Sequence, residues 1–203
     1  RALFQWHGNY ADAFGFGIPD GLMRIYGHRL SEGFVNMWEV PNLWLQKFPA
    51  EEFEMVSKVR VSAKQTSEGV SSGIIVMGWD YARLGLQKRG DGFVMQFTTC
   101  TDAEQGGAEH TADVAEIAPS RVYAAGLYPN LECDIYLRLT VGKGGKCRFS
   151  YRTDGGRKYT QAGEFTARAG KWIGAKAGFY SIMPAGVSER GWIDVLNSDL
   201  RIK

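Results

Sequence analysis

The chain has 203 residues, 44% of them hydrophobic and 13% aromatic, which is enough to bury a substantial core in one domain over residues 1–203. Its 24 basic and 22 acidic residues leave a formal charge of +2 and are scattered, which argues against nucleic acid or an anionic membrane as a partner. No stretch approaches the roughly 18 consecutive apolar residues that cross a bilayer.

The chain begins at Arg1, without a methionine. Its first residues lack the basic, apolar and small-residue order of a secretion signal. We therefore expect a mature or excised piece of a longer protein.

A period of two governs nearly the whole chain and predicts β-strands. Residues 42–48, NLWLQKF, form the first clear strand, and its side chains alternate between two faces. Trp44 and Gln46 therefore share one row. We expect that row to face either a hollow for a ligand or the seam beside it.

Four further strands follow. Residues 52–63 alternate apolar and charged side chains, the pattern of a half-buried antiparallel strand, and residues 73–79 are apolar on both faces, as in a central strand. Two apolar runs flank RGDG within residues 84–97. Asp91 and Gly92 there predict a tight hairpin, because this pair tolerates a positive φ.

A meander is predicted in the second half of the chain, with strands at residues 133–141, 147–153 and 157–165 joined by glycine-rich turns. Residues 172–182 and 191–195 supply the last strands. No helix of ten residues and no fixed-period repeat is found, which argues against a propeller or solenoid. The predicted fold class is all-β, a two-sheet antiparallel β-sandwich of the jelly-roll type.

The longest polar stretch, residues 102–120, predicts a loop with one short strand. Its acidic residues are expected to be solvated on that loop: Asp102, Glu104, Glu109, Asp113 and Glu116.

Cysteine and histidine do not form metal patterns. The three cysteines fit neither a disulfide framework nor a zinc site, so we expect small buried or half-buried thiols, at Cys100, Cys133 and Cys147. The three histidines are far apart and are expected at the surface or as caps, at His7, His28 and His110. No cofactor is predicted.

Glycosidic bond cleavage requires two carboxyl groups that face one cleft. The nearest candidate is ECDIYL, in which Glu132 and Asp134 share one strand face, but Tyr136 and Leu137 stand where a further Glu would be needed. No nucleophile elbow, phosphate loop or dinucleotide fingerprint occurs. We therefore predict that this chain is not itself an enzyme.

A sugar ring has an apolar C–H face and a rim of hydroxyls, so its binding site needs flat aromatic rings beside planar polar groups. Residues 78–88 offer Trp79, Asp80, Tyr81 and Arg83 in a short span. Arg138, on a polar strand face, is able to rim such a site. The alternative is that each tryptophan belongs to the core.

Several segments in order resemble the C-terminal concanavalin A-like sandwich of glycoside hydrolase family 43 β-xylosidases and arabinofuranosidases. They are VPNLWLQKFPAEEF, SSGIIVMGWDYARLGLQK, YLRLTV, FSYRTDGG, AGKWIGAKAGFYS and GWIDV. The resemblance covers nearly the whole chain. It implies a concanavalin A-like fold, joined in the parent enzyme to a five-bladed propeller that carries the catalytic carboxylates.

Further expectations come from this resemblance. Family members bind xylan in some enzymes, and in others form a lid that lends an aromatic residue to the propeller's pocket. The matching position here is Trp172, which otherwise caps the sandwich. A secreted or periplasmic bacterial protein is implied. The ending, residues 195–203, departs from the family pattern, so no structural calcium is predicted there.

Two functions therefore compete. The first is a non-catalytic carbohydrate-binding module for a plant polysaccharide or oligosaccharide, xylan or arabinoxylan. The second is a structural module that packs on the propeller and completes its pocket without binding sugar by itself. The predicted ligand-binding residues are Trp44, Gln46, Trp79, Asp80, Tyr81, Arg83, Arg138 and Trp172.

Overall fold

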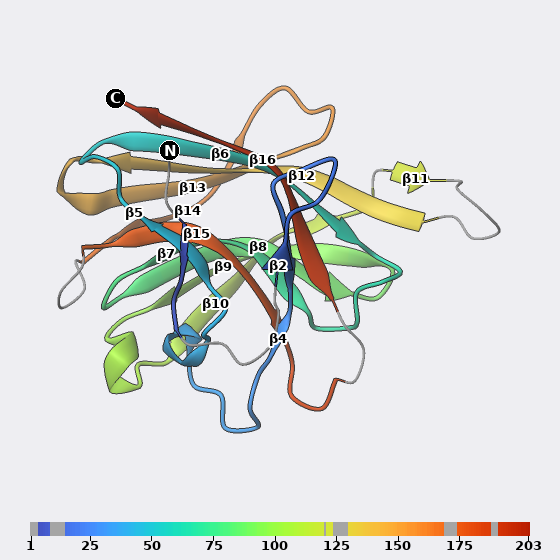
Figure 1. The fold of residues 1–203 in the computed structure, drawn as a ribbon, viewed down its shortest axis with the longest axis horizontal. Helices are drawn as coiled ribbons and strands as arrows, with labels where there is room; N and C mark the ends of the chain where they lie inside the picture. The colour runs from blue at the N-terminus through green and yellow to red at the C-terminus, as the bar shows by residue number, and fades with distance from the viewer. Residues whose placement is uncertain (1–3, 9–14, 120, 124–129, 169–173, 188–190) are drawn as a thin grey trace.

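The computed structural model describes residues 4–8, 15–119, 121–123, 130–168, 174–187 and 191–203. These residues form sixteen strands and three short 3-10 helices. No helix in the described part of the chain is long and apolar enough to cross a membrane. The strands build two antiparallel sheets stacked face to face, so the predicted all-β sandwich is confirmed (Figure 1).

Sheet A takes most of its strands from the middle of the chain. In spatial order it contains β1 (Gln5–Trp6), β5 (Trp44–Lys47), β15 (Lys176–Met183), β7 (Ser71–Met77), β8 (Tyr81–Arg89), β9 (Gly92–Cys100) and β10 (Glu109–Ile117). The short β4 (His28–Arg29) pairs in parallel with β15. The neighbours β7, β8, β9 and β10 follow one another in sequence, as expected for a meander.

Sheet B combines strands from both ends of the chain with the predicted second meander. In spatial order it contains β14 (Thr160–Thr166), β13 (Lys146–Thr153), β12 (Asn130–Gly142), β6 (Phe53–Ser62), β16 (Trp192–Ile202), β3 (Met23–Tyr26) and β2 (Gly15–Phe16). The strand β11 (Arg121–Tyr123) pairs with β12. The 3-10 helices are η1 (Met37–Glu39), η2 (Ala103–Gln105) and η3 (Lys143–Gly145).

The main core lies between the sheets. Alternation along β12 directs Ile135, Leu137 and Leu139 inward, where they are fully buried with the rings of Phe149 and Phe179. The opposite row of β12 points away from sheet A and is polar, as period-two patterning requires.

The row that holds Trp44 and Gln46 faces this interior. The register pairs Gln46 with Ala177 and Trp44 with Phe179, both of which belong to the inter-sheet core. The Trp44 ring stacks on Phe4 with centroids 4.1 Å apart, and Gln46 is 4% exposed. The strand register therefore turns this row toward the interior between the sheets, and its predicted contact with a sugar stays a prediction.

Sheet A is also covered on its outer face. The segment of residues 30–43, which includes η1, lays Met37, Val40 and Leu43 over Ile75 and other buried side chains of the sheet. This second apolar cluster explains why residues 73–79 are apolar on both faces. The predicted central strand is therefore confirmed as β7.

One predicted turn differs in detail. The β8–β9 hairpin exists, but its two turn residues are Gly90 and Asp91, and the positive φ, 54°, belongs to Gly90. The prediction placed this turn one residue too late. A glycine at the first turn position satisfies the twist of a two-residue hairpin equally well.

The prediction of a loop over residues 102–120 was wrong in its extent. After η2, residues Glu109–Ile117 form the nine-residue strand β10, paired with β9 along its length. Glu109 is half-buried and pairs with Arg83, whereas Asp113 is exposed, as predicted, and pairs with Arg89. The polar composition of β10 reflects its place at the edge of sheet A.

The cysteines are free and buried, as predicted, at Cys100, Cys133 and Cys147. Burial raises the pKa of the Cys133 and Cys147 thiols to about 12. Both thiols therefore stay protonated at neutral pH and act as small apolar side chains.

We predict that Phe179→Ala lowers the free energy of unfolding by about 3–5 kcal/mol, because it opens a cavity beneath Trp44 and Phe4 in the main core. Urea unfolding followed by tryptophan fluorescence measures this change. The control is Ile202→Ala, at a side chain that is 65% exposed, where the change should stay within about 0.5 kcal/mol. Equal effects of the two variants would contradict the assignment of this core.

Candidate functional site

The predicted ligand-binding residues do not gather in one cleft. Trp44 and Gln46 belong to the core described above. Trp172 lies outside the described residues. The remaining five lie on different surfaces, at the end of sheet A (Trp79 and Asp80), on its outer face (Tyr81 and Arg83) and on the outer face of sheet B (Arg138).

Tyr81 and Arg83 form a buried polar network instead of a sugar site. The Tyr81 hydroxyl donates to Glu109 Oε1 at 2.5 Å and accepts from the backbone N–H of Met37 at 3.0 Å. Arg83 donates from Nη2 to Glu109 Oε2 at 2.9 Å, and from Nη1 to the Tyr180 hydroxyl at 3.3 Å. These contacts occupy the polar atoms that a sugar would need.

The network also keeps its charges. Burial lowers the pKa of Arg83, but Tyr180 and Glu109 raise it by more, so the guanidinium stays charged. Burial, together with the charge of Glu109, raises the pKa of Tyr81 far above its usual range. A neutral tyrosine between a carboxylate and a backbone amide fixes the segment 30–43 onto sheet A.

Trp79 and Asp80 lie in the β7–β8 turn, at one end of the sandwich. Trp79 is 38% exposed, and the guanidinium of Arg168 lies 5.7 Å from its ring centroid. Asp80 accepts from Nε and Nη2 of Arg168, each at 2.5 Å, and from the backbone N–H of Asp102 at 2.8 Å. Arg168 also pairs with the carboxylate of Asp102.

These hydrogen bonds set the charge state of Asp80. The bonds from Arg168 hold the pKa of Asp80 below its ordinary value of 3.8, although partial burial acts in the opposite direction. The carboxylate is therefore ionised at neutral pH. It ties the β7–β8 turn to the segments on both sides of it.

A backbone hydrogen bond joins the η2 loop to this turn, because Ala103 N–H donates to the Trp79 carbonyl at 2.8 Å. Next to Arg168, Ala167 N–H donates to the Gly145 carbonyl at 2.9 Å, which joins the end of β14 to the β12–β13 turn. The η2 loop and the β12–β13 turn both lie at the left of the molecule in Figure 1. We call this region, with Val35, Trp79, Asp80, Asp102 and Arg168, the Trp79 end.

An exposed valine, Val35, directly precedes Asn36, whose side chain is bonded to the η2 loop. The next residue, Asn36, donates from Nδ2 to the carbonyl of Ala103 at 2.9 Å and to that of Gly107 at 2.8 Å, which fixes Val35 beside the η2 loop. Val35 is 44% exposed. Hydrogen bonds to the η2 loop thus hold both segments that carry the exposed side chains of Val35 and Trp79.

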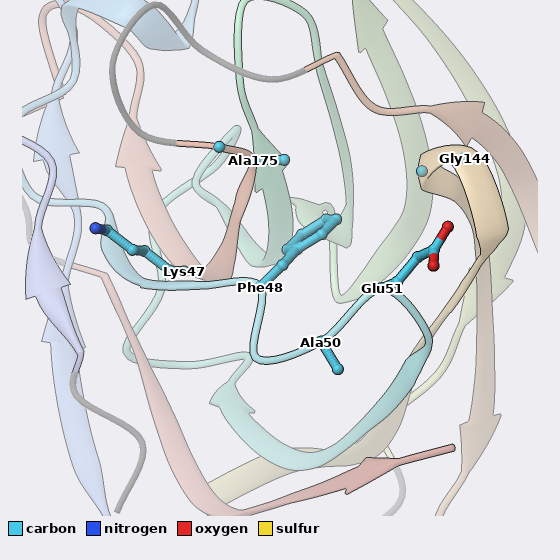
Figure 2. A pocket seen from close by; sticks show the side chains of 8 residues that line it. Lys47, Phe48, Ala50, Glu51, Gly144 and Ala175 are labelled. Atoms are coloured by element: carbon cyan, nitrogen blue, oxygen red, sulfur yellow. The ribbon is translucent and has the colours of Figure 1, made fainter.

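A pocket of about 370 Å³ opens between the sheets near the β5–β6 loop. Figure 2 shows the Phe48 ring pointing into it, with Glu51 and Gly144 on one side and Ala175 on the other. The backbone N–H of Phe48 donates to the Ala175 carbonyl at 3.1 Å, which holds the start of β15 against this loop. The pocket is mainly apolar and contains one carboxylate.

The acidic pair noted in the sequence is held by cations. Asp134 is buried and lies 2.6 Å from Arg60 Nε and 3.3 Å from Lys58 Nζ, while Glu132 lies 3.2 Å from Arg60 Nε. Burial raises the pKa of Asp134, but Arg60 and Lys58 lower it by more, so the pKa lies below its ordinary value. No group of three or more metal-ligating side chains occurs among the described residues.

Sequence reasoning found Trp79 and Asp80 but missed Val35 and Arg168. Arg168 lies 88 residues from Asp80 and had no motif around it. Val35 lies in a segment without clear periodicity. An Asp directly after an exposed Trp in a β-turn was the available signal that the turn is fixed by a distant partner.

The stacked sheets define a concanavalin A-like β-sandwich. Residues 2–196 match the family model of the β-xylosidase C-terminal concanavalin A-like domain, so the chain belongs to that family. The resemblance found in the sequence is confirmed. A search of curated proteins finds no match.

Several solved structures of larger proteins contain a part with the same fold. A bifunctional GH43-CE protein from Bacteroides eggerthii matches with a TM-score of 0.71 and 16% identity, over 98% of this chain and 24% of its own. The GH43 protein of Bacillus licheniformis matches with a TM-score of 0.61 and 14% identity, over 89% of this chain and 33% of its own. A xylan β-1,4-xylosidase from Bacillus halodurans matches with a TM-score of 0.61 and 12% identity, over 88% of this chain and 32% of its own. This chain spans about a quarter to a third of those proteins.

We predict that Asp80→Asn lowers the melting temperature at neutral pH but much less near pH 2. Because the folded pKa of Asp80 lies below 3.8, its carboxylate stabilises the native state above that value and loses this effect as the pH falls through the folded pKa. Differential scanning calorimetry across this range measures the difference between wild type and variant.

The control for this prediction is Asp199→Asn, at an exposed position of β16, which should change the melting temperature little at any pH. A difference for Asp80→Asn that stays constant with pH would show that the charge of Asp80 does not hold the Trp79 end together.

Proposed function

We propose that this domain is a non-catalytic accessory module of a family 43 glycoside hydrolase, which packs on the catalytic domain through the Trp79 end. The observation that carries the proposal is the anchored, partly exposed Trp79. Tryptophan and arginine are the residues most enriched among the side chains that dominate protein interfaces. Here both occur together, beside Val35, on loops fixed by backbone hydrogen bonds.

Pre-organisation favours this use of the Trp79 end. Arg168 is held by two carboxylates and lies over the Trp79 ring, so little side-chain freedom remains to be lost on association. A mixed apolar and charged surface of this kind is typical of contacts between domains of one chain. The burial of Tyr81 and Arg83 favours this proposal over a sugar site on the outer face of sheet A.

The location and substrate follow from the same relationship. Since similar domains occur in GH43 proteins of bacteria, we infer a parent enzyme that acts on plant polysaccharide, xylan or arabinoxylan, and is secreted or periplasmic. The propeller supplies the acids for hydrolysis in this proposal, and the present domain completes the enzyme's surface.

We predict that the domain binds the separately produced catalytic domain from its own gene, and that Trp79→Ala weakens this binding at least about tenfold. Isothermal titration calorimetry measures the dissociation constant. Leu22→Ala is the matched control, because Leu22 is 48% exposed but precedes β3 of sheet B. Its binding should equal that of wild type.

Two outcomes would contradict the proposal. One is the absence of binding. The other is equal binding by wild type and Trp79→Ala. Migration in gels that contain arabinoxylan gives a separate result, because retardation that is abolished by Trp79→Ala would instead support the carbohydrate-binding hypothesis at this end of the sandwich.

A further inference from the structure

The outer face of sheet B carries a row in which arginines and tyrosines alternate. The Arg152 guanidinium lies 3.9 Å from the ring centroid of Tyr136 and 5.5 Å from that of Tyr159. The Arg138 guanidinium lies 4.0 Å from the Tyr159 ring centroid. All four side chains are half-buried, and we call them the Tyr–Arg row.

Strand register creates this row. Tyr136 of β12 pairs with Arg152 of β13, and Arg138 pairs with Ser150. Their neighbours in β12, Ile135 and Leu137, face the core, so the row must face away from it. Tyr159 is the residue directly before β14, and its ring contacts the guanidinium groups of both arginines.

The arginines of the Tyr–Arg row lack acidic partners, unlike the other cations near them. Arg60 and Lys58 share Asp134, and Arg148 pairs with Glu164 at 3.1 Å. Within the described ranges, no carboxylate lies within ion-pair distance of Arg138 or Arg152. The face therefore holds two positive charges that the fold does not neutralise.

Most hydrogen-bond donors of these arginines point to no protein acceptor in the described part of the chain. Arg138 donates from Nε to Ser150 Oγ at 2.9 Å, and Arg152 donates from Nη1 to the Gly156 carbonyl. Both terminal nitrogens of Arg138 and Nη2 of Arg152 remain available. Guanidinium groups fixed by stacking present such donors in a geometry that suits a carboxylate.

A pocket of about 600 Å³ continues along the same strands. It begins at Thr140, the next outward position of β12 after Arg138, and is lined further by Thr166, Lys146 and Glu164. Its walls thus combine hydroxyl, ammonium and carboxylate groups. These groups bind the hydroxyl rim of a sugar, while tyrosine rings receive the apolar face.

We propose that this surface binds a saccharide that carries a carboxylate, a hexuronic acid unit of an acidic polysaccharide. The carboxylate of this unit accepts hydrogen bonds from Arg138 and Arg152, and the sugar ring of the same unit packs beside Tyr159. The adjoining sugar of the chain enters the pocket at Thr140. This inference does not depend on the docking of the Trp79 end, since Arg138, Arg152 and Tyr159 are not part of that end.

Affinity electrophoresis tests the proposal with four soluble polymers: glucuronoxylan, the same glucuronoxylan after its carboxyl groups are reduced to alcohols, polygalacturonate and neutral arabinoxylan. We expect retardation in glucuronoxylan or polygalacturonate, and the stronger of the two identifies the source of the acid. Retardation should fall at least tenfold in the carboxyl-reduced polymer and in arabinoxylan. Equal retardation in native and reduced glucuronoxylan would overturn the proposal, as would none in either acidic polymer.

Three variants and one control locate the site. Arg138→Gln and Tyr159→Ala should each weaken binding at least tenfold, while Arg138→Lys, which keeps the charge but loses the planar fork, should have an intermediate effect. Arg29→Gln removes the same charge at an exposed position of sheet A and should bind like wild type. If Arg29→Gln weakens binding as much as Arg138→Gln, the attraction is only a general effect of charge and the proposed site is wrong. Circular dichroism verifies that each variant is folded.

Discussion

The burial of sheet A on both faces is the constraint on which the rest of this structure depends. A strand whose two rows of side chains are both apolar must be covered on both faces of its sheet. Sheet B covers the inner face, and the segment 30–43 covers the outer one through Met37, Val40 and Leu43. Arg83 beneath this cover must be neutralised by Glu109, because an unpaired buried charge would be strongly destabilising. The segment 30–43 therefore covers the outer face of sheet A, where the predicted ligand-binding residues Tyr81 and Arg83 lie.

The two recognition surfaces that we propose lie where these covers do not reach. The Trp79 end combines exposed apolar groups with charges already paired by the fold, the combination expected where another protein domain docks. The outer face of sheet B combines paired cations near Asp134 with unpaired ones in the Tyr–Arg row. Arg60 thus stabilises the fold through its acidic neighbour Asp134. The arginines of the Tyr–Arg row have no carboxylate within ion-pair distance among the described residues, and these are the arginines that we propose to bind a ligand.

The chain belongs to the β-xylosidase C-terminal concanavalin A-like domain family. The similar structures are 12–16% identical to this chain and preserve the sandwich as a whole. At such identity a common core persists through alternation and packing volume, while surface side chains diverge. The role of each surface must therefore be derived from its own contacts.

The sequence by itself determined the all-β class, the strands β6 and β7, the second meander and the buried thiols, because these depend on local alternation and turn residues. It also singled out Trp79 and Asp80. It did not determine which face each row would meet, so Trp44 and Gln46 were assigned to a possible sugar site. Only the tertiary structure decided that, since strand register and the cover over sheet A bring together residues such as Asp80 and Arg168 that are distant in sequence.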